Sequence, residues 1–174
     1  MAKLRKFCAY KRTERPYTRI SKFKKKSFIK ANPHIAIVRF EMGEPRKKFE
    51  YTYSLTAKST LQIRHNALES ARQSSNRLLE KTLGTANYFF KIRIYPYHIL
   101  RENPLASGAG ADRFSTGMAH PFGKPIGKAA QVKRGQILAT LSVDKNHLET
   151  AKTAMKRVAY KLPCACLIEL SKNA

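Results

Sequence analysis

Hydrophobic and polar positions alternate with a period of two in two stretches of the first third of the chain. Residues 49–56 alternate and are rich in Thr and Tyr, a composition typical of β-strands. Residues 34–40 form a β-branched run that follows Pro33 and ends before the Gly-Glu-Pro turn signal at 43–45. We therefore predict one strand over each of these two stretches.

Further strands are predicted in the second half of the chain. Residues 88–100 are apolar and aromatic, with basic residues alternating with isoleucines, and Pro96 is expected to end or bend this strand. Residues 132–143 predict a strand pair or one long bent strand, with a turn or bulge at Gly135. The closing strand is expected over residues 164–170.

The hydrophobic period changes to that of an amphipathic helix between Thr60 and Leu83, where apolar residues recur at steps of three, four and seven. Gly84 then stands where a left-handed residue commonly ends a helix. The opposite face carries charges of both signs. It could therefore be a solubilising surface or an RNA contact. Its charged residues are Arg64, Arg72, Arg77, Lys81, Glu69 and Glu80.

A second helix is predicted over residues 146–162, where apolar positions again form one stripe. Asn146 can cap it, with Glu149 three residues later in capping-box register, and Pro163 should stop it. Strands and two helices in this order imply an α+β fold, with two helices packed on a mainly antiparallel sheet. We expect a single domain over residues 1–174.

A long segment without periodicity, residues 101–131, separates the predicted strands. It holds five of the eight glycines and three of the eight prolines of the chain. Loops of this length are usually functional or disordered, and the large apolar residues Phe114, Met118 and Phe122 weigh against a flexible linker. Glycines also let backbone N–H groups approach a phosphate closely. The segment is therefore predicted to be a functional loop.

Net charge gives the clearest indication of a partner. The chain has 174 residues and is 43% hydrophobic, which favours a folded domain, yet its formal net charge is +24. Self-repulsion of this size is relieved by a polyanion, so nucleic acid is the first partner to consider and an anionic membrane surface the second. No apolar run approaches the roughly 20 residues of a membrane span, and no secretory signal is expected.

Enzyme, metal and disulfide chemistry have little support in the sequence. The odd cysteine count favours reduced thiols over a disulfide framework, and the five histidines lack metal-ligand spacing, so no cofactor or metal is expected. The segment Gly117–Lys124 has one residue too many for a P-loop and lacks the following Ser or Thr. Among the histidines only His120, in the long loop, is a candidate for RNA hydrogen bonding or stacking.

The basic residues concentrate at the start of the chain. Residues 1–30 contain 12 Lys and Arg and one acid, a net charge of +11, and aromatic residues are interleaved with the bases. A solvated tail is one alternative, but disordered tails are poor in aromatic residues. Rings can stack on bases while Lys and Arg hold phosphates, so we favour an RNA-binding arm. The predicted rRNA-binding residues are Lys3, Arg5, Lys6, Lys11, Arg12, Arg15, Tyr17, Arg19, Lys22, Lys24, Lys25 and Lys26.

The long loop and its flanks resemble a known family. The matching loop motifs are Leu100-Arg-Glu-Asn103, Ala109-Gly-Ala-Asp-Arg113, Thr116-Gly-Met118 and Phe122-Gly-Lys-Pro125. The flanking matches are Arg15-Pro-Tyr17, Leu68-Glu-Ser-Ala-Arg72, residues 90–98, Gly135-Gln-Ile137 and the final helix. Together they resemble the universal large-subunit ribosomal protein family called L-sixteen in bacteria and L-ten-e in archaea and eukaryotes. The chain length suits an archaeal member, and the loop departs from the family pattern at Ala119 and His120.

The resemblance implies a non-enzymatic, ribosome-bound cytoplasmic protein. Its body would bind large-subunit (23S-type) rRNA, with 5S rRNA and neighbouring ribosomal proteins as further partners and no membrane contact. The loop would reach toward the aminoacyl-tRNA site near the peptidyl-transferase centre and help to position tRNA. The tRNA-proximal residues are then Arg101, Asn103, Gly108, Gly110, Arg113, Thr116, Gly117, Met118, His120, Gly123, Lys124 and Lys128.

Three alternatives stand beside this expectation. A non-ribosomal RNA or DNA binder, such as an assembly factor or chromatin protein, would share the charge, but a groove-reading DNA protein should show bases and amides clustered on one helix face. The second predicted helix offers Lys152, Lys156 and Arg157, which could hold phosphates without reading bases. An enzyme for anionic substrates would need a titrating cluster that the sequence does not show. Membrane-surface binding is a further alternative for the basic arm, although its aromatic residues do not form one helical stripe.

Overall fold

The computed structural model describes residues 6–29, 31–102 and 123–173. The helices are α1 (His65–Leu83) and α3 (Leu148–Lys161), with short 3₁₀ helices η1 (Phe7–Tyr10), η2 (Lys24–Lys26), η3 (Thr85–Asn87) and η4 (Lys145–His147). The strands are β1 (Glu41–Gly43), β2 (Tyr51–Ala57), β3 (Leu61–Arg64), β4 (Tyr88–Ile92), β5 (His98–Glu102), β6 (Lys124–Val132), β7 (Ile137–Val143) and β8 (Cys166–Lys172).

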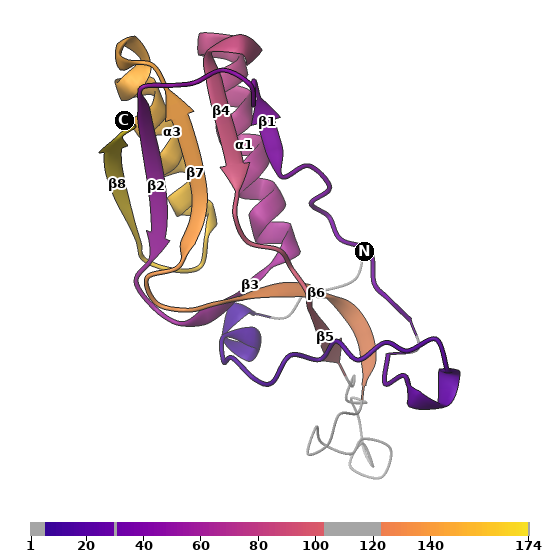
Figure 1. Ribbon diagram of the computed structural model, residues 1–174. Helices are drawn as coiled ribbons and strands as arrows, with labels where there is room; N and C mark the ends of the chain where they lie inside the picture. The colour runs from indigo at the N-terminus through magenta and orange to yellow at the C-terminus, as the bar shows by residue number, and fades with distance from the viewer. Residues whose placement is uncertain (1–5, 30, 103–122, 174) are drawn as a thin grey trace.

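Within the described residues the strands form two antiparallel sheets. The large sheet has the order β1-β4-β7-β2-β8, and the small sheet has the order β3-β6-β5. Figure 1 shows the two sheets at opposite ends of an elongated molecule, with the N-terminal residues running past the small sheet. This confirms the predicted α+β fold, with two helices and mainly antiparallel sheet among the described residues; the strands form two sheets.

The hydrophobic core lies between the helices and one face of the large sheet (Figure 1). Leu55 of β2, Phe90 of β4 and Leu141 of β7 are fully buried, as are Leu79 of α1 and Met155 of α3. Burial alternates along β4, so every second side chain enters this core, as a half-buried strand requires. Removal of these side chains from water is the main stabilising contribution to such a layer.

The predicted helix over 60–83 is too long at its N-terminal end, because residues 61–64 form strand β3. Leu61, Gln62 and Ile63 are all buried and pair with β6, a pattern that local periodicity cannot distinguish from the start of a helix. At the other end, Gly84 donates its N–H to the Glu80 carbonyl, as a helix-ending residue should. Its φ of 72° is combined with a ψ of 163°, so it is not in the predicted left-handed helical conformation.

The predicted strand over 34–40 is wrong, and pairing begins only at β1. The inward–outward alternation is present, since Ile37 is 2% exposed and Val38 is 81% exposed. The backbone groups, however, have other partners: the Ala36 N–H donates to Nδ1 of His65, and the Phe40 carbonyl accepts from Ile92. The alternation therefore reflects an extended segment on the core without a strand partner of its own.

The remaining strands follow the prediction with shifted bounds. Residues 88–100 divide into β4 and β5 on either side of Pro96, and Gly135, at φ 79°, lies in the turn between β6 and β7. β6 begins at Lys124, so the predicted loop over 101–131 is too long at its C-terminal end. Its run of Ala, Gly and Lys carries no alternation that would have revealed a strand.

The start of the second helix also differs from the prediction. Residues 145–147 form η4, so α3 begins at Leu148 and His147 occupies the N-cap position without a side-chain cap bond. Asn146 is therefore not the cap, and the capping box with Glu149 does not form. The predicted apolar stripe is confirmed by the burial of Ala151, Met155 and Val158.

Candidate nucleic-acid interface

A closed basic loop projects from the N-terminal part of the chain. We define the basic loop as residues 17–29. The Tyr17 hydroxyl donates to the Phe28 carbonyl over 2.9 Å, and the Phe28 N–H donates to the Arg19 carbonyl over 3.1 Å. Ile29 is 6% exposed and anchors the closed end. These contacts hold the two ends together, so the loop keeps one shape despite having only η2 as regular structure.

The tip of the basic loop exposes both cations and apolar side chains. It contains five Lys and Arg and no acidic residue. Phe23 is 69% exposed and Phe28 is 58% exposed. The Arg19 guanidinium lies 4.7 Å from the Phe28 ring centre, and Lys26 Nζ lies 5.4 Å from that of Phe23. Exposed rings beside cations are the combination by which proteins stack on RNA bases and hold phosphates.

Residues 12–17, which we call the arm segment, cross the small sheet and are bound to it by side-chain amides. The Gln62 amide of β3 donates to the Arg12 carbonyl, and the Gln131 amide of β6 donates to the Glu14 carbonyl over 2.8 Å. The arm segment therefore has fixed partners on two neighbouring strands, which places the basic loop that follows it.

The third strand of the small sheet completes this attachment. The Tyr17 N–H donates to Nδ1 of His98 over 2.9 Å, and the Ile99 N–H donates to the Tyr17 carbonyl over 3.3 Å. The Arg101 guanidinium lies 4.2 Å from the Tyr17 ring centre, a cation–π contact. Tyr17 and Arg101 were predicted as RNA-contacting residues, and the structure brings the two together at the junction of arm and sheet.

Two histidines use Nδ1 as an acceptor for a backbone N–H, which requires that nitrogen to be unprotonated. His65 accepts from Ala36 over 2.9 Å, and its pKa is lowered by burial and by the charges of Arg64 and Lys128. Burial also lowers the pKa of His98; Arg101 adds to this effect and Glu14 opposes it. Both shifts favour the neutral ring that these two attachments need.

The predicted tRNA-proximal residues divide between described and undescribed parts of the chain. Arg101 lies in β5, Lys124 and Lys128 lie in β6, and Gly123 precedes β6. Lys128 is 8% exposed, so most of its side chain is packed inside the protein. The other predicted loop residues lie outside the described residues: Asn103, Gly108, Gly110, Arg113, Thr116, Gly117, Met118 and His120. Lys3 and Arg5 of the predicted arm also lie outside them.

Exposed aromatic residues between β4 and β5 were missed by the sequence analysis. Tyr95 is 53% exposed and Tyr97 is 39% exposed, and the rings of Tyr95 and Phe40 lie 5.5 Å apart. Tyr95, Phe40 and Val38 border a cavity of about 470 Å³ that Lys128 also lines. The Tyr-Pro-Tyr sequence could have indicated these exposed rings. Because the proline interrupts the strand, the tyrosines on either side of it do not pair with a neighbouring strand.

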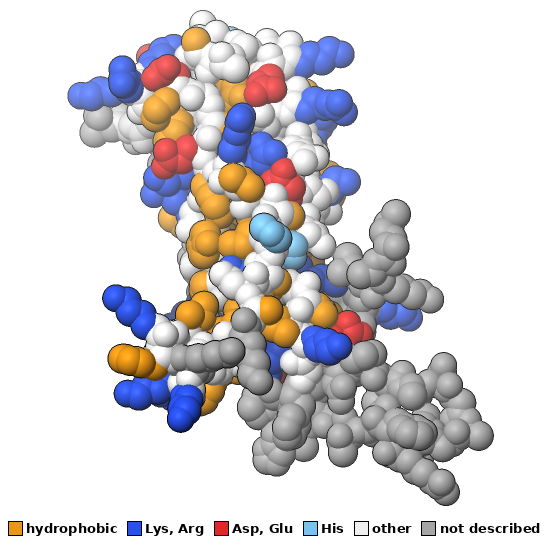
Figure 2. Space-filling view, turned by 90° about the vertical axis from the view of Figure 1, so that its right-hand side faces the viewer, with side chains coloured by type: hydrophobic (Ala, Val, Ile, Leu, Met, Phe, Trp, Pro, Cys, Tyr) orange, Lys and Arg blue, Asp and Glu red, His pale blue; other side chains and the backbone are white. Residues whose placement is uncertain are grey.

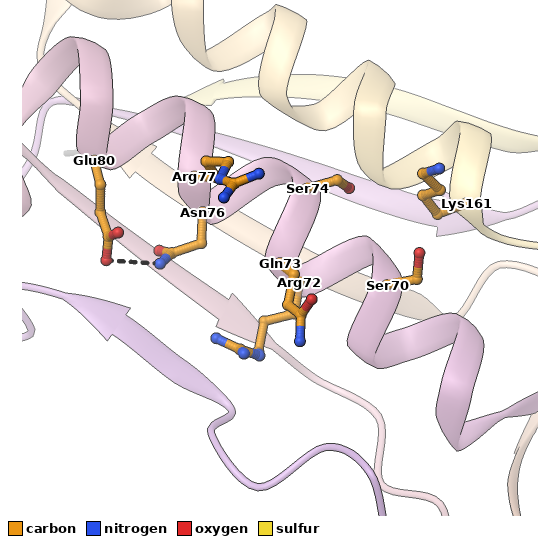
Figure 3. A pocket seen from close by; sticks show the side chains of 8 residues that line it. All are labelled: Ser70, Arg72, Gln73, Ser74, Asn76, Arg77, Glu80 and Lys161. Atoms are coloured by element: carbon orange, nitrogen blue, oxygen red, sulfur yellow. Dashed lines mark hydrogen bonds between the residues drawn. The ribbon is translucent and has the colours of Figure 1, made fainter.

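The polar groove on α1 is a weaker candidate for a ligand site (Figure 3). Arg72 is held by Glu69 over 2.7 Å, and this bond lowers the pKa of Glu69. Asn76 donates to Glu80 and accepts from the Tyr88 hydroxyl. Most of its polar groups thus satisfy one another, which favours the solubilising alternative for this face.

Charge is distributed unequally over the face shown in Figure 2. Acidic side chains lie among basic ones mainly where the helices and the large sheet form the surface, and apolar side chains gather toward the small sheet. Three ion pairs agree with this distribution, since Lys47–Asp144, Lys91–Glu41 and Arg72–Glu69 all belong to the large-sheet half. The basic loop itself contains no acidic residue that could neutralise its cations in this way.

The described residues contain no cluster of three or more His, Cys, Asp or Glu that could hold a metal ion. All three cysteines lie among the described residues and are free thiols. No helix in the described part of the chain is long and apolar enough to cross a membrane. The described residues of the arm segment and basic loop instead present cations beside aromatic rings.

Comparison with known proteins identifies the family of the chain. A family model described as "Ribosomal protein L16p/L10e" matches residues 15–169. The chain belongs to this family. It is 44% identical over 159 residues to "Large ribosomal subunit protein uL16" of Methanococcus maripaludis, covering 91% of this chain and 88% of that protein. It is 48% identical over 148 residues to the protein of the same name from Staphylothermus marinus, covering 85% and 82%.

The family confirms the resemblance found in the sequence, including its archaeal character, since both of these relatives are archaeal. It also confirms the expectation of a non-enzymatic ribosomal protein. The DNA-binding and enzymatic alternatives are thereby set aside.

Proposed function

We propose that this protein is a structural constituent of the large ribosomal subunit and binds large-subunit rRNA through the arm segment and the basic loop. The observation that carries the proposal is the basic loop itself, with five cations, no acid and two exposed phenylalanines. Counterion release on phosphate neutralisation provides the affinity, and the rings provide stacking surfaces. The names of the curated relatives support the large subunit as the site of assembly.

The experiment is fractionation of a native lysate on sucrose gradients in low and high salt, followed by detection of the chain. We expect stoichiometric co-sedimentation with the large subunit that persists in high salt. Recovery at the top of the gradient in both salts would contradict the proposal. Extraction of the RNA that remains bound then shows whether 23S-type rRNA alone, or 5S rRNA as well, is in contact.

The second part of the proposal concerns the stretch of sequence that connects β5 to β6. We propose that it extends toward the aminoacyl-tRNA site near the peptidyl-transferase centre and helps to position tRNA. The motif resemblance supports this role, and Arg113 is its test position. In large subunits that contain Arg113→Ala, we expect normal subunit assembly but weaker aminoacyl-tRNA binding, measured by filter retention of labelled tRNA. Unchanged tRNA binding would remove this part and leave the rRNA contact intact.

A further inference from the structure

Two cysteines meet where the chain turns from α3 into β8, an outer strand of the large sheet (Figure 1). Cys166 is the first residue of β8, and Cys164 belongs to the bend over residues 162–164 that precedes it. Residues two apart in a regular strand are separated by about 6.6 Å along the strand. The bend instead brings the two sulfur atoms to 3.5 Å, so the two thiols are in contact.

The hydrogen bond between the two thiols makes them chemically unequal. Hydrogen bonding to Cys166 lowers the pKa of Cys164, against the opposing effect of burial. The same hydrogen bond, together with burial, raises the pKa of Cys166. Because the thiolate is the nucleophile in thiol–disulfide exchange, Cys164 is the thiol that reacts first. Cys166 then lies beside the sulfur that has reacted.

The pair is open to small reagents and is held by the fold. Cys164 and Cys166 are both half-buried, so they retain surface that is open to solvent, and both pack against the hydrophobic core. Cys8 of η1 provides an internal comparison, because it is exposed and contacts no other thiol among the described residues, which include all three cysteines. A single thiol of this kind can form a mixed disulfide but not an intramolecular one.

We propose that Cys164 and Cys166 form a reversible oxidation site, which a small-molecule disulfide such as oxidised glutathione converts to an intramolecular disulfide. The Cys164 thiolate attacks one sulfur of the oxidant, whose S–S bond breaks and releases the first thiol. Cys166 then attacks Sγ of Cys164, and the mixed disulfide breaks to release the second thiol. Two electrons pass from the cysteine pair to the oxidant, and the protons of the two cysteines end on the two released thiols.

Formation of the mixed disulfide also favours the second step. Cys164 is then no longer a thiolate, so the hydrogen bond that raises the pKa of Cys166 is lost. Cys166 can lose its proton and attack the neighbouring sulfur, which lies 3.5 Å away in the reduced protein. Neither cysteine belongs to the arm segment or the basic loop, so oxidation at this site is independent of the proposed RNA binding.

The test exposes the folded full chain to oxidised glutathione near neutral pH. The remaining thiols are blocked with N-ethylmaleimide, and the chain is digested with trypsin without reductant for mass spectrometry. Because trypsin cleaves after Lys and Arg, the peptide 162–172 carries both cysteines of the pair and the peptide 7–11 carries Cys8. We expect the peptide 162–172 to lose two hydrogen atoms and the peptide 7–11 to gain one glutathione. Dithiothreitol should reverse both changes.

Serine variants separate the two steps. Cys166→Ser removes the second thiol, so Cys164 should retain glutathione and the loss of two hydrogen atoms should disappear. In Cys164→Ser, glutathione should add to Cys166 more slowly than it adds to Cys164 in Cys166→Ser. Cys8→Ser is the matched control, because it removes one thiol outside the pair and should leave the modification of the peptide 162–172 unchanged.

Retention of glutathione by the wild-type peptide 162–172, or the absence of any change in it, would overturn the inference. A disulfide that forms only after the chain is unfolded in urea would also overturn it, because the folded arrangement would then not bring the thiols together. If circular dichroism shows that Cys166→Ser does not fold, the comparison of the two wild-type peptides decides the question. Binding to rRNA is measured separately by sedimentation, so the proposed function would survive each of these results.

Discussion

Replacement of Lys22, Lys25 and Lys26 by alanine should weaken rRNA binding and make it less dependent on salt. All three side chains are exposed on the basic loop and form no hydrogen bond or ion pair with the described residues. Lys26 contacts only the exposed ring of Phe23. Substitutions at such positions usually change folding stability by no more than about 0.5 kcal/mol. The effect on binding can therefore be separated from an effect on the fold.

The magnitude follows from the number of phosphates that the three lysines neutralise. Each contact contributes about 0.9 to the slope of log K against log salt for a duplex, so three contacts contribute about 2.7. If the affinities of wild type and variant converge at 1 M salt, the variant binds about 500-fold more weakly at 0.1 M, and about 8-fold more weakly if only one lysine contacts a phosphate. The assay is binding of purified large-subunit rRNA between 0.1 and 1 M monovalent salt.

The matched control replaces Lys152, Lys156 and Arg157 of α3 by alanine. These residues are also exposed, and the substitution removes the same three charges from the other end of the molecule. A general effect of net charge would change the two slopes equally. If the slope of the basic-loop variant changes no more than that of the α3 variant, the assignment of the rRNA contact to the basic loop is refuted.

Two further perturbations test the fold. Gly43→Ala should lower the free energy of unfolding by at least about 2 kcal/mol, because φ is +87° and the new Cβ would lie 2.1 Å from the Tyr88 carbonyl oxygen. Urea unfolding measures the loss. Gly84→Ala is the control and should lose less, because no atom lies within 4 Å of its new Cβ. Because burial lowers the pKa of His65 and His98, the unfolded chain binds protons first below about pH 6.5, so the melting temperature should fall between pH 7 and 5. A double change to Gln should reduce that fall; an unchanged fall would exclude the histidines as its cause.

Local periodicity predicted the elements that bury one face against the core. β2, β4 and the apolar stripe of α3 belong to this group, since each has a strong pattern of its own. The strand β3 was missed because Leu61 and Ile63 suit a strand and the start of a helix equally well. Only pairing with β6, whose partner residues begin at Val132, decides between them. β6 itself was hidden because small residues and lysines give no alternation.

The sequence predicted which residue types make up the candidate interface, but not how the structure arranges them. The charge and aromatic content of residues 1–30 indicated RNA binding without any structure. The amides that hold the arm segment were not predictable, because Gln62 and Gln131 bond to carbonyl groups 50 and 117 residues away in the chain. A glutamine in a strand carries no signal that its partner is a backbone carbonyl, since any backbone carbonyl presents the same acceptor.

The separation of charge between the two halves of the molecule has a consequence for assembly. In the large-sheet half, acids such as Glu69 and Asp144 form ion pairs with neighbouring cations, so part of its positive charge is balanced within the protein. The basic loop has five cations within 13 residues and no acid, and its closing hydrogen bonds must hold against their mutual repulsion. Phosphates would remove that repulsion while the helix-covered core stays unchanged. Binding of rRNA should therefore stabilise the basic loop and the arm segment far more than the core, and amide hydrogen exchange should slow most at Tyr17 and Phe28, whose N–H groups hold the arm and close the loop.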